Sequence, residues 1–243
     1  MGEVHKGNKP RGVIKAMRLV IKISGKYFTP IETGYADRLA SVLRSLHDKG
    51  DRIALVVGGG KTARDYIKPL RELGVNEGYL DLVGIRASRL NAYTLALLLG
   101  DRAYPEIPSS IEKFLEFWAT GRIVVAGGFQ PGQSTNAVSA LIAEAVKADV
   151  LYNLTNVDGV YTDDPRKNPS ARKIDEITIK ELKELLSGKT SYAGTYELFD
   201  RLSLDIIERS RIKVVVLDGS DPYNIIRHLK GEKIGTLVNP GSH

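Results

Sequence analysis

Short apolar segments alternate along this chain with longer segments in which apolar residues recur every three or four positions. The apolar segments, expected to be strands, are residues 18–24, 52–57, 122–126, 149–155, 213–217 and 236–238. The segments expected to be helices are residues 35–49, 62–73, 80–99, 111–119, 138–146, 197–210 and 223–230. Strands that are apolar throughout are buried on both faces, so this alternation predicts an α/β fold with a mostly parallel sheet covered by helices.

Two local sequence signals concern the course of one expected helix and the start of another. Pro69 is expected to interrupt or bend the helix over residues 62–73, because a proline inside a helix removes a hydrogen bond and clashes with the preceding turn. Ser109 with Glu112 matches a capping box, which places the start of the next helix near residue 111.

The chain shows no repeat, low-complexity tract or flexible linker, so residues 17–240 are expected to form a single domain with one continuous sheet. Two functional lobes are expected within it, residues 17–150 and 151–240. Residues 1–16 are apolar-poor and basic and are expected to be a disordered extension. Residues 241–243 are treated as a short tail.

Composition excludes several classes of function. The chain has no cysteine, which excludes disulfides and cysteine-ligated metals and agrees with a cytoplasmic setting. No apolar run approaches the roughly 20 residues of a membrane span, and no secretory signal is recognisable. The net charge of +6 is modest, and no basic stripe with interleaved aromatic residues is present. Binding to nucleic acid is therefore not expected, and small anionic ligands suit the charge better.

A glycine-rich segment, GGGKTAR at residues 58–64, directly follows the apolar segment 52–57. Glycines let the backbone approach an anion closely, and a helix that begins near Thr62 offers unpaired N–H groups and the positive end of its dipole. Arg64, one turn into that helix, could add a bidentate contact to a phosphate. A tight strand-to-helix turn without a ligand remains an alternative.

Two familiar nucleotide motifs match this segment only in part. The GKT at residues 60–62 ends a Walker A motif, but the first glycine would fall at Leu55, inside the strand. The dinucleotide pattern is matched by Gly58, Gly60 and Ala63. It follows the second strand instead of the first, however, and the nearest suitable acidic residue, Asp81, looks like part of a helix start.

Two further loops of similar character follow expected strands. Residues 22–26 read KISGK, with Lys22 inside an apolar segment, and residues 124–135 read VVAGGFQPGQST. Lys22 could be a surface residue of an edge strand or a residue of the site. Because ligands of parallel sheets bind beyond the carboxyl ends of the strands, the three loops predict one crevice for two phosphate-bearing ligands.

Taken in order, the segments KISGK, VVGGGKTAR, AGGFQPGQST and TNVDGVYTDDP resemble the amino-acid kinase superfamily. Within it the chain resembles the archaeal-type UMP kinases, from Met17 to about Pro240. The segments LDLVGIRASRLNA at 80–92 and GGFQPGQST at 127–135 are specific to that subgroup. The resemblance implies a three-layer αβα sandwich in which the N-terminal lobe binds UMP and the C-terminal lobe binds ATP. It also implies Mg²⁺-dependent phosphoryl transfer that yields UDP and ADP, and a homohexamer.

The same resemblance implies roles for individual residues. Those expected to contact UMP are Gly58, Gly59, Asp81, Phe129, Gln130, Pro131, Gly132, Gln133, Ser134 and Thr135. Those expected to contact ATP are Gly25, Lys26, Gly60, Arg64, Thr155, Tyr161 and Asp164. Lys22, Lys26 and Arg64 are the expected catalytic residues, and no residue is assigned to bind a metal directly. For Asp81 two readings stay open, contact with the ribose or capping of its own helix. Asp164 could likewise only shape its loop.

This chemistry fits the residues of the loops. Phosphoryl transfer needs alignment and charge neutralisation more than covalent help, and the phosphate of UMP is already a nucleophile. Isopentenyl phosphate kinases resemble a version with histidines in the acceptor loops, and the four histidines here all lie elsewhere. Acetylglutamate kinase and a non-catalytic nucleotide- or oxyanion-binding protein remain alternatives.

Overall fold

The computed structural model describes residues 16–28, 31–163, 168–187 and 198–241. Its centre is a seven-stranded sheet in the order β3-β2-β1-β4-β8-β9-β7. Every neighbouring pair is parallel except β8 and β9, which are antiparallel. The predicted mostly parallel sheet is therefore confirmed. The strands are β1 (Arg18–Ile23), β2 (Arg52–Val57), β3 (Val124–Ala126), β4 (Val150–Thr155), β7 (Glu176–Thr178), β8 (Val214–Asp218) and β9 (Thr236–Asn239).

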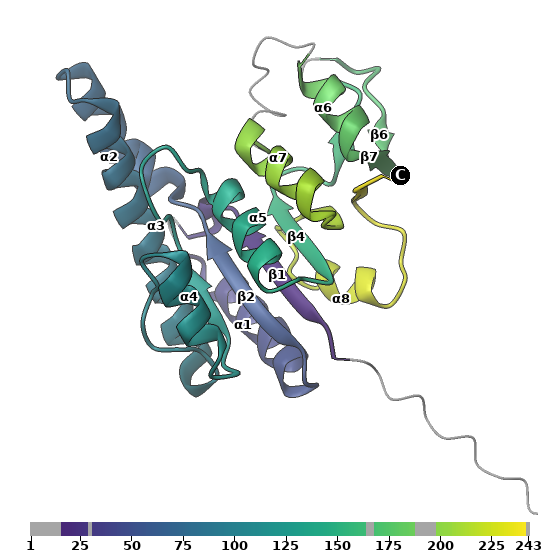
Figure 1. Cartoon of the computed structure of the whole chain (residues 1–243), viewed down its shortest axis with the longest axis horizontal. Coiled ribbons are helices and arrows are strands. Elements are labelled where there is room, and N and C mark those ends of the chain that lie inside the picture. Colours follow the sequence, from purple (N-terminus) through teal and green to yellow (C-terminus); the bar gives the residue numbers. More distant parts are fainter. Residues whose placement is uncertain (1–15, 29–30, 164–167, 188–197, 242–243) are drawn as a thin grey trace, which may run out of the picture.

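Helices cover both faces of this sheet (Figure 1). They are α1 (Thr33–Asp48), α2 (Gly60–Glu72), α3 (Glu77–Leu99), α4 (Ile111–Trp118), α5 (Thr135–Ala145), α6 (Ile179–Ser187), α7 (Arg201–Ser210) and α8 (Asn224–Leu229). Two short 3₁₀ turns, η1 (Gly25–Tyr27) and η2 (Gly100–Arg102), complete the described helical elements.

The core is divided by the sheet into two apolar layers. Leu19, Ile21 and Ile23 of β1 point toward one layer, which contains buried residues of α1, α3 and α8. Val20 points toward the other, which contains buried residues of α4, α5, α6 and α7. Alternating residues of one strand thus enter two different layers, because successive side chains of a strand point to opposite faces. The arrangement is the expected αβα sandwich.

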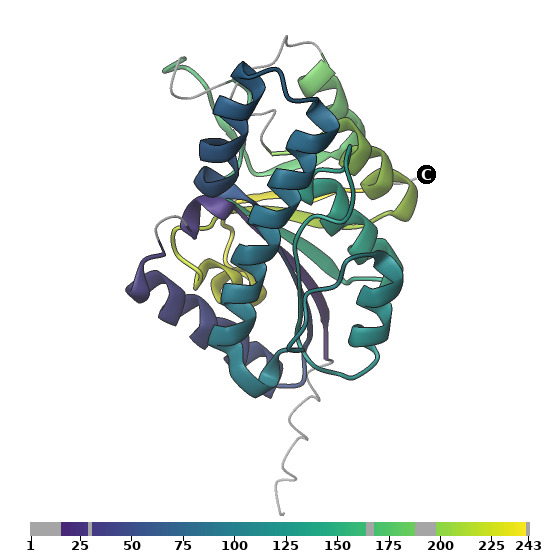
Figure 2. The same ribbon diagram turned by 90° about the vertical axis from the view of Figure 1, so that its left-hand side faces the viewer.

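Helices α2 and α3 form an antiparallel pair that projects beyond the strands (Figures 1 and 2). Pro69 lies inside α2 without ending it, so of the two expected effects the interruption is wrong, while the bend stays a prediction. The last turn still closes, with the N–H of Leu73 donating to the carbonyl of Pro69 at 3.1 Å.

Two other expectations need correction, and one is not tested. The sheet is not fully continuous, because β5 (Val160–Tyr161) and β6 (Lys173–Ile174) form a separate two-stranded sheet. Helix α4 is capped by Ser110, which accepts from the N–H of Lys113, and not by Ser109. Residues 1–15 and 242–243 lie outside the described residues, so the expected extension is not tested.

Candidate active site

The order of the strands fixes where the functional loops meet. From β1 the sheet grows in one direction through β2 and β3, and in the other through β4 and β8. Strand β1 therefore lies at the point where the strand order reverses, which is where open α/β sheets bind their ligands. The loops after β1, β2, β3 and β4 all leave the same edge of the sheet. These are the loops that carry the glycine-rich segments.

Close contact between the first two loops explains their glycines. A methyl group on Gly25 would lie 2.2 Å from the carbonyl oxygen of Gly58, and one on Gly60 would lie 2.2 Å from the carbonyl oxygen of Gly25. Gly60 also has a φ of +62°, in the left-handed region that favours glycine. The two loops can touch only because these positions lack side chains.

Lys22 lies on β1, an interior strand of the sheet, and is only 7% exposed, so the edge-strand reading of this lysine is wrong. It pairs in register with Val56 of β2 on one side and with Asn153 of β4 on the other. A lysine buried at the centre of a sheet requires partners for its charge. Its position, one residue from the carboxyl end of β1, is consistent with a role in the site.

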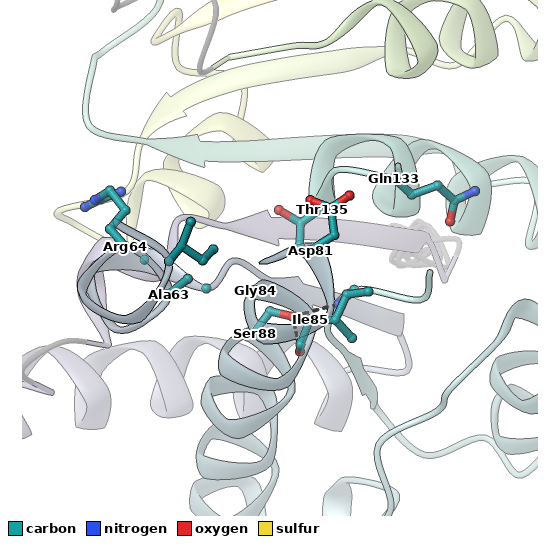
Figure 3. Close-up of a pocket in the computed structure, with 12 residues that line it drawn as sticks. Ala63, Arg64, Asp81, Gly84, Ile85, Ser88, Gln133 and Thr135 are labelled. Carbon is teal, nitrogen blue, oxygen red and sulfur yellow. Dashed lines mark hydrogen bonds between the residues drawn. The ribbon is translucent and has the colours of Figure 1, made fainter. Parts of the chain in front are cut away.

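A cavity of about 290 Å³ lies between α2, α3 and the loop after β3. Figure 3 shows the residues that line it. It brings together six of the predicted site residues. These six are Gly59, Gly60, Arg64, Asp81, Gln133 and Thr135. The rest of its lining comes from Ala63, Ile67, Gly84, Ile85, Ser88 and Gly128. The wall thus combines a cation, a carboxylate and two glycine-rich backbones with an apolar patch, a combination suited to a small polar anion.

Several predicted residues do not line this cavity. Gly58 and Gly132 lie in the same loops but outside its wall, as do Phe129, Gln130, Pro131 and Ser134. Lys22, Gly25, Lys26, Thr155 and Tyr161 belong to the neighbouring region at the ends of β1 and β4 or to the small sheet. Asp164 lies outside the described residues.

Asp81 does not cap its helix. Helix α3 begins at Glu77, and the side chain of Asn76 caps it by accepting from the N–H of Gly78 at 2.8 Å. Asp81 lies one turn further on, where its Oδ2 accepts from the N–H of Gly132 at 2.8 Å. Its carboxylate therefore joins α3 to the loop after β3 and also faces the cavity.

Residues of α3 that were not predicted from the sequence hold both glycine-rich loops. Ser88 Oγ accepts from the N–H of Gly128 at 2.8 Å, and Asn91 Nδ2 donates to the carbonyl of Gly58 at 2.8 Å. Arg89 donates to the carbonyls of Gly128 and Phe129. The sequence pattern could have indicated Ser88 and Asn91, because both are polar residues on the apolar side of an expected helix. Buried polar residues of this kind need hydrogen-bond partners.

Asp200 was also not predicted from the sequence. Its carboxylate links the first turns of α5 and α7. It caps α7 by accepting from the N–H of Ser203 at 3.0 Å. Its other oxygen accepts a hydrogen bond from the hydroxyl of Ser134, which caps α5. The expected helix over residues 197–210 thus begins at Arg201. This contact ties the GGFQPGQST loop to the second half of the chain.

On the predicted ATP side, Tyr27 connects the ends of β1 and β4. Its hydroxyl donates to the carbonyl of Thr155 at 2.8 Å, and the Nζ of Lys26 lies 5.6 Å from its ring centroid. Burial, followed by the charge of Asp218, raises the pKa of Tyr27 above its ordinary value, so this tyrosine stays a neutral donor. Tyr161 donates to Asp158 Oδ1 at 2.7 Å, and this hydrogen bond raises the pKa of Tyr161.

In residues 16–28, 31–163, 168–187 and 198–241, no group of three or more His, Asp or Glu side chains could hold a metal ion. The same residues contain no helix with the length and apolar character needed to cross a bilayer.

Glycine-rich loops, an arginine and a carboxylate around a cavity at the switch point of a parallel sheet define an α/β protein suited to binding phosphorylated small molecules. Residues 17–218 match the model of the amino acid kinase family. The chain belongs to that family.

Similar proteins support the same assignment. The chain is 51% identical over 225 residues to a uridylate kinase of Metallosphaera sedula. The matched region covers 92% of this chain and 100% of the relative. It is 48% identical to a uridylate kinase of Sulfurisphaera tokodaii with the same coverage. The crystal structure of the uridylate kinase of Archaeoglobus fulgidus, 40% identical, superposes with a TM-score of 0.82 and covers 91% of this chain and 100% of that chain.

Proposed function

We propose that this chain is a UMP kinase, which transfers the γ-phosphoryl group of ATP to UMP to give UDP and ADP. The observation that carries the proposal is the cavity in which Arg64 and Asp81 meet two glycine-rich loops. Relatives named uridylate kinase match the chain over nearly its whole length at about half identity, which supports the choice of acceptor.

In the cavity, the backbone of Gly59 contacts UMP at the point where Gly60 and Arg64 face the phosphoryl group that is transferred. The residues proposed to surround the sugar and base of UMP are Gly58, Asp81 and the loop residues Phe129, Gln130, Pro131, Gly132, Gln133, Ser134 and Thr135. The guanidinium of Arg64 lies in the first turns of α2, so that its charge and the positive end of the helix dipole both attract a phosphate. Asp81 offers acceptor oxygens to ribose hydroxyls.

ATP is proposed to bind at the ends of β1 and β4. Gly25, Lys26, Thr155, Tyr161 and Asp164 would contact it, and Gly60 and Arg64 would face the phosphoryl group in transit. Lys22, Lys26 and Arg64 stabilise the charge that develops on the phosphoryl oxygens, which is the main task of a protein in this reaction. No general base is needed because the acceptor is already an anion.

Mg²⁺ bound with ATP would neutralise phosphate charge during transfer. The described residues contain no cluster of carboxylates that could hold the ion by itself. This suits a Mg²⁺ ion held mainly by substrate phosphates and water. This is the usual way in which Mg²⁺ enters phosphoryl-transfer sites.

We further propose that the chain assembles as a homohexamer and acts in the cytoplasm in pyrimidine nucleotide biosynthesis. An exposed apolar stripe along α3 supports assembly. Its members are Tyr79, Leu82, Leu90, Tyr93 and Leu97, which are 38–67% exposed in the single chain. Their successive spacings of three, eight, three and four residues place them on one face of the helix, and exposed apolar residues gathered on one face mark an interaction surface.

The decisive experiment measures ADP release by the purified chain with ATP and five candidate acceptors. These are UMP, CMP, AMP, acetylglutamate and isopentenyl phosphate. UMP should give the highest kcat/KM. Turnover with another acceptor but not with UMP would assign a different kinase activity, and no turnover with any acceptor would favour a non-catalytic binding protein.

A further inference from the structure

One turn of α3 contacts both glycine-rich loops of the cavity. Ser88 and Arg89 contact the loop after β3, and Asn91 contacts the loop after β2. All three belong to the segment 80–92, of which only Asp81 was proposed above to contact a substrate. What the other contacts of this segment do for substrate binding is therefore still to be assigned.

Arg89 makes three hydrogen bonds, all to main-chain carbonyls. Its Nε donates to Gly128 at 3.0 Å, and its Nη2 donates to Phe129 and to Ser109, each at 3.2 Å. Within the described part of the chain it has no carboxylate partner. Burial, and then the charge of Arg86, lower the pKa of Arg89 from its ordinary value. A guanidinium keeps its charge even so, and its planar fork suits two adjacent carbonyls.

The loop after β3 lies directly against this turn of α3. A methyl group on Gly127 would come within 2.8 Å of both the main-chain nitrogen of Arg89 and the hydroxyl oxygen of Ser88. One on Gly128 would come within 2.9 Å of the Ile85 side chain. The loop and the helix therefore fit together only with glycine at these positions. The hydrogen bonds from the Arg89 side chain to Gly128 and Phe129 hold the loop against the helix.

Asn91 fixes the first loop in a comparable way. It is 4% exposed, and its Nδ2 donates to the carbonyls of Gly58 at 2.8 Å and Gly59 at 3.4 Å. Hence a single rigid helical turn sets the distance between the two loops that form opposite parts of the cavity (Figure 3).

We propose that Arg89 is the positioning residue of the UMP-binding loop, and that Asn91 plays the same part for the phosphate-binding loop. Neither touches the reacting atoms. Together they hold the cavity at the width of its ligand. Arg89, which contacts only the loop after β3 and Ser109, determines affinity for the acceptor and leaves the ATP side unchanged. The acceptor named here rests on the proposed function, whereas the positioning of the loops does not.

The kinetic test compares Arg89→Met, which keeps an apolar stem, with Arg89→Lys, which keeps the charge and loses the fork. Arg89→Met should raise KM for UMP about ten- to hundredfold, the range expected when hydrogen bonds from a charged donor are lost. Arg89→Lys should recover part of this, and KM for ATP should stay within about twofold in both. Equal changes for both substrates, or none, would overturn the proposal.

Arg44→Met is the matched control. Arg44 also donates to a main-chain carbonyl, that of Leu98 at 2.6 Å, near the other end of α3. Its loss should leave both KM values unchanged. If Arg44→Met changed KM for UMP as strongly as Arg89→Met, the effect would be one of general stability and the positioning role would be wrong.

Amide hydrogen exchange tests the loops without any substrate. The N–H groups of Gly128 and Gly58 are both hydrogen-bonded, to Ser88 Oγ and to the carbonyl of Ile23, so each reports on its own loop. Arg89→Met should speed exchange in residues 127–133 only, and Asn91→Ser in residues 58–60 only. A uniform increase in either variant would contradict the assignment. If the wild type fails to phosphorylate UMP, the proposed function fails, while this exchange pattern still decides the positioning roles.

Discussion

Arg64 lies in the first turns of α2, exposed at the wall of the cavity. A cation held there can follow the charge of a phosphoryl group as it moves between the two nucleotides. Arg64→Ala should therefore lower kcat by roughly 10²–10³, the usual cost of removing one preorganised electrostatic donor. Steady-state kinetics of the variant checks this. Lys68→Ala, one turn further along α2, is the control and should leave kcat within about twofold. A raised KM with unchanged kcat would restrict Arg64 to ground-state binding.

The carboxylate of Asp81 accepts a hydrogen bond from the N–H of Gly132 and also faces the cavity. It can therefore hold the loop after β3 and bind a ligand at the same time. If it also accepts from the 2′-hydroxyl of the ribose, UMP should exceed dUMP in kcat/KM by roughly 10- to 150-fold, as for a hydrogen bond to a charged acceptor. Asp81→Asn keeps the shape and should reduce that ratio sharply without changing KM for ATP. Measuring both nucleotides on wild type and variant decides the matter, with Asp101→Asn beyond the far end of α3 as a control. An unchanged ratio would leave Asp81 only its contact with the loop.

At the scale of single residues, the sequence predicted Arg64 and Asp81 as site residues but not the groups that they contact. Both line the cavity, and their roles stay predictions. The bond from Gly132 to Asp81 joins residues 51 positions apart, and no local pattern encodes such a pair. Lys22 was left open between surface and site because its burial depends on which strands flank β1, which only the assembled sheet shows.

At the scale of elements, two glycines allow the cost of backbone strain to be measured separately from the cost of a steric clash between the loops. Gly60 and Gly74 both have positive φ, +62° and +80°. A methyl group on Gly60 would lie 2.2 Å from the carbonyl oxygen of Gly25, whereas one on Gly74 would meet nothing within 4 Å. Gly74→Ala should cost only the backbone strain, about 1–2 kcal/mol, and keep full activity. Gly60→Ala should cost more and abolish turnover, since the two loops must separate. Thermal melting and kinetics test the pair, and equal losses of stability would show that contact between the loops is unimportant.

The elements themselves were largely predictable, and the errors have physical causes. The strands of the main sheet with five or more residues were located to within about one residue, because buried parallel strands are continuously apolar. Strands β5, β6 and β7 contain only two or three residues each, too few for any periodicity. Ser109 and Ser110 are adjacent serines, so sequence spacing alone could not decide which one caps α4.

At the scale of the whole molecule, the layers followed from the sequence but the strand order did not. Order depends on which helix packs on which face, and that is decided by contacts far apart in the chain. The position of β1 at the switch point explains why the KISGK segment lies against the glycine-rich loop after β2. The proposed assembly is a property of the same scale, and it rests on the stripe of α3 defined above.

A charge placed in that stripe should disrupt the assembly. Leu90 is 58% and Leu97 64% exposed in the single chain, and the burial of each in an interface would remove apolar surface from water. Light scattering after size exclusion should give the wild type a mass of six 26.7 kDa chains. Leu90→Glu and Leu97→Glu should give smaller species, because a buried unpaired carboxylate strongly disfavours an interface. Leu73→Glu, at an 80% exposed leucine beyond the end of α2 and outside the stripe, should leave the mass unchanged. A monomeric wild type, or a hexamer that survives both glutamates, would show that α3 is not the surface through which the chains associate.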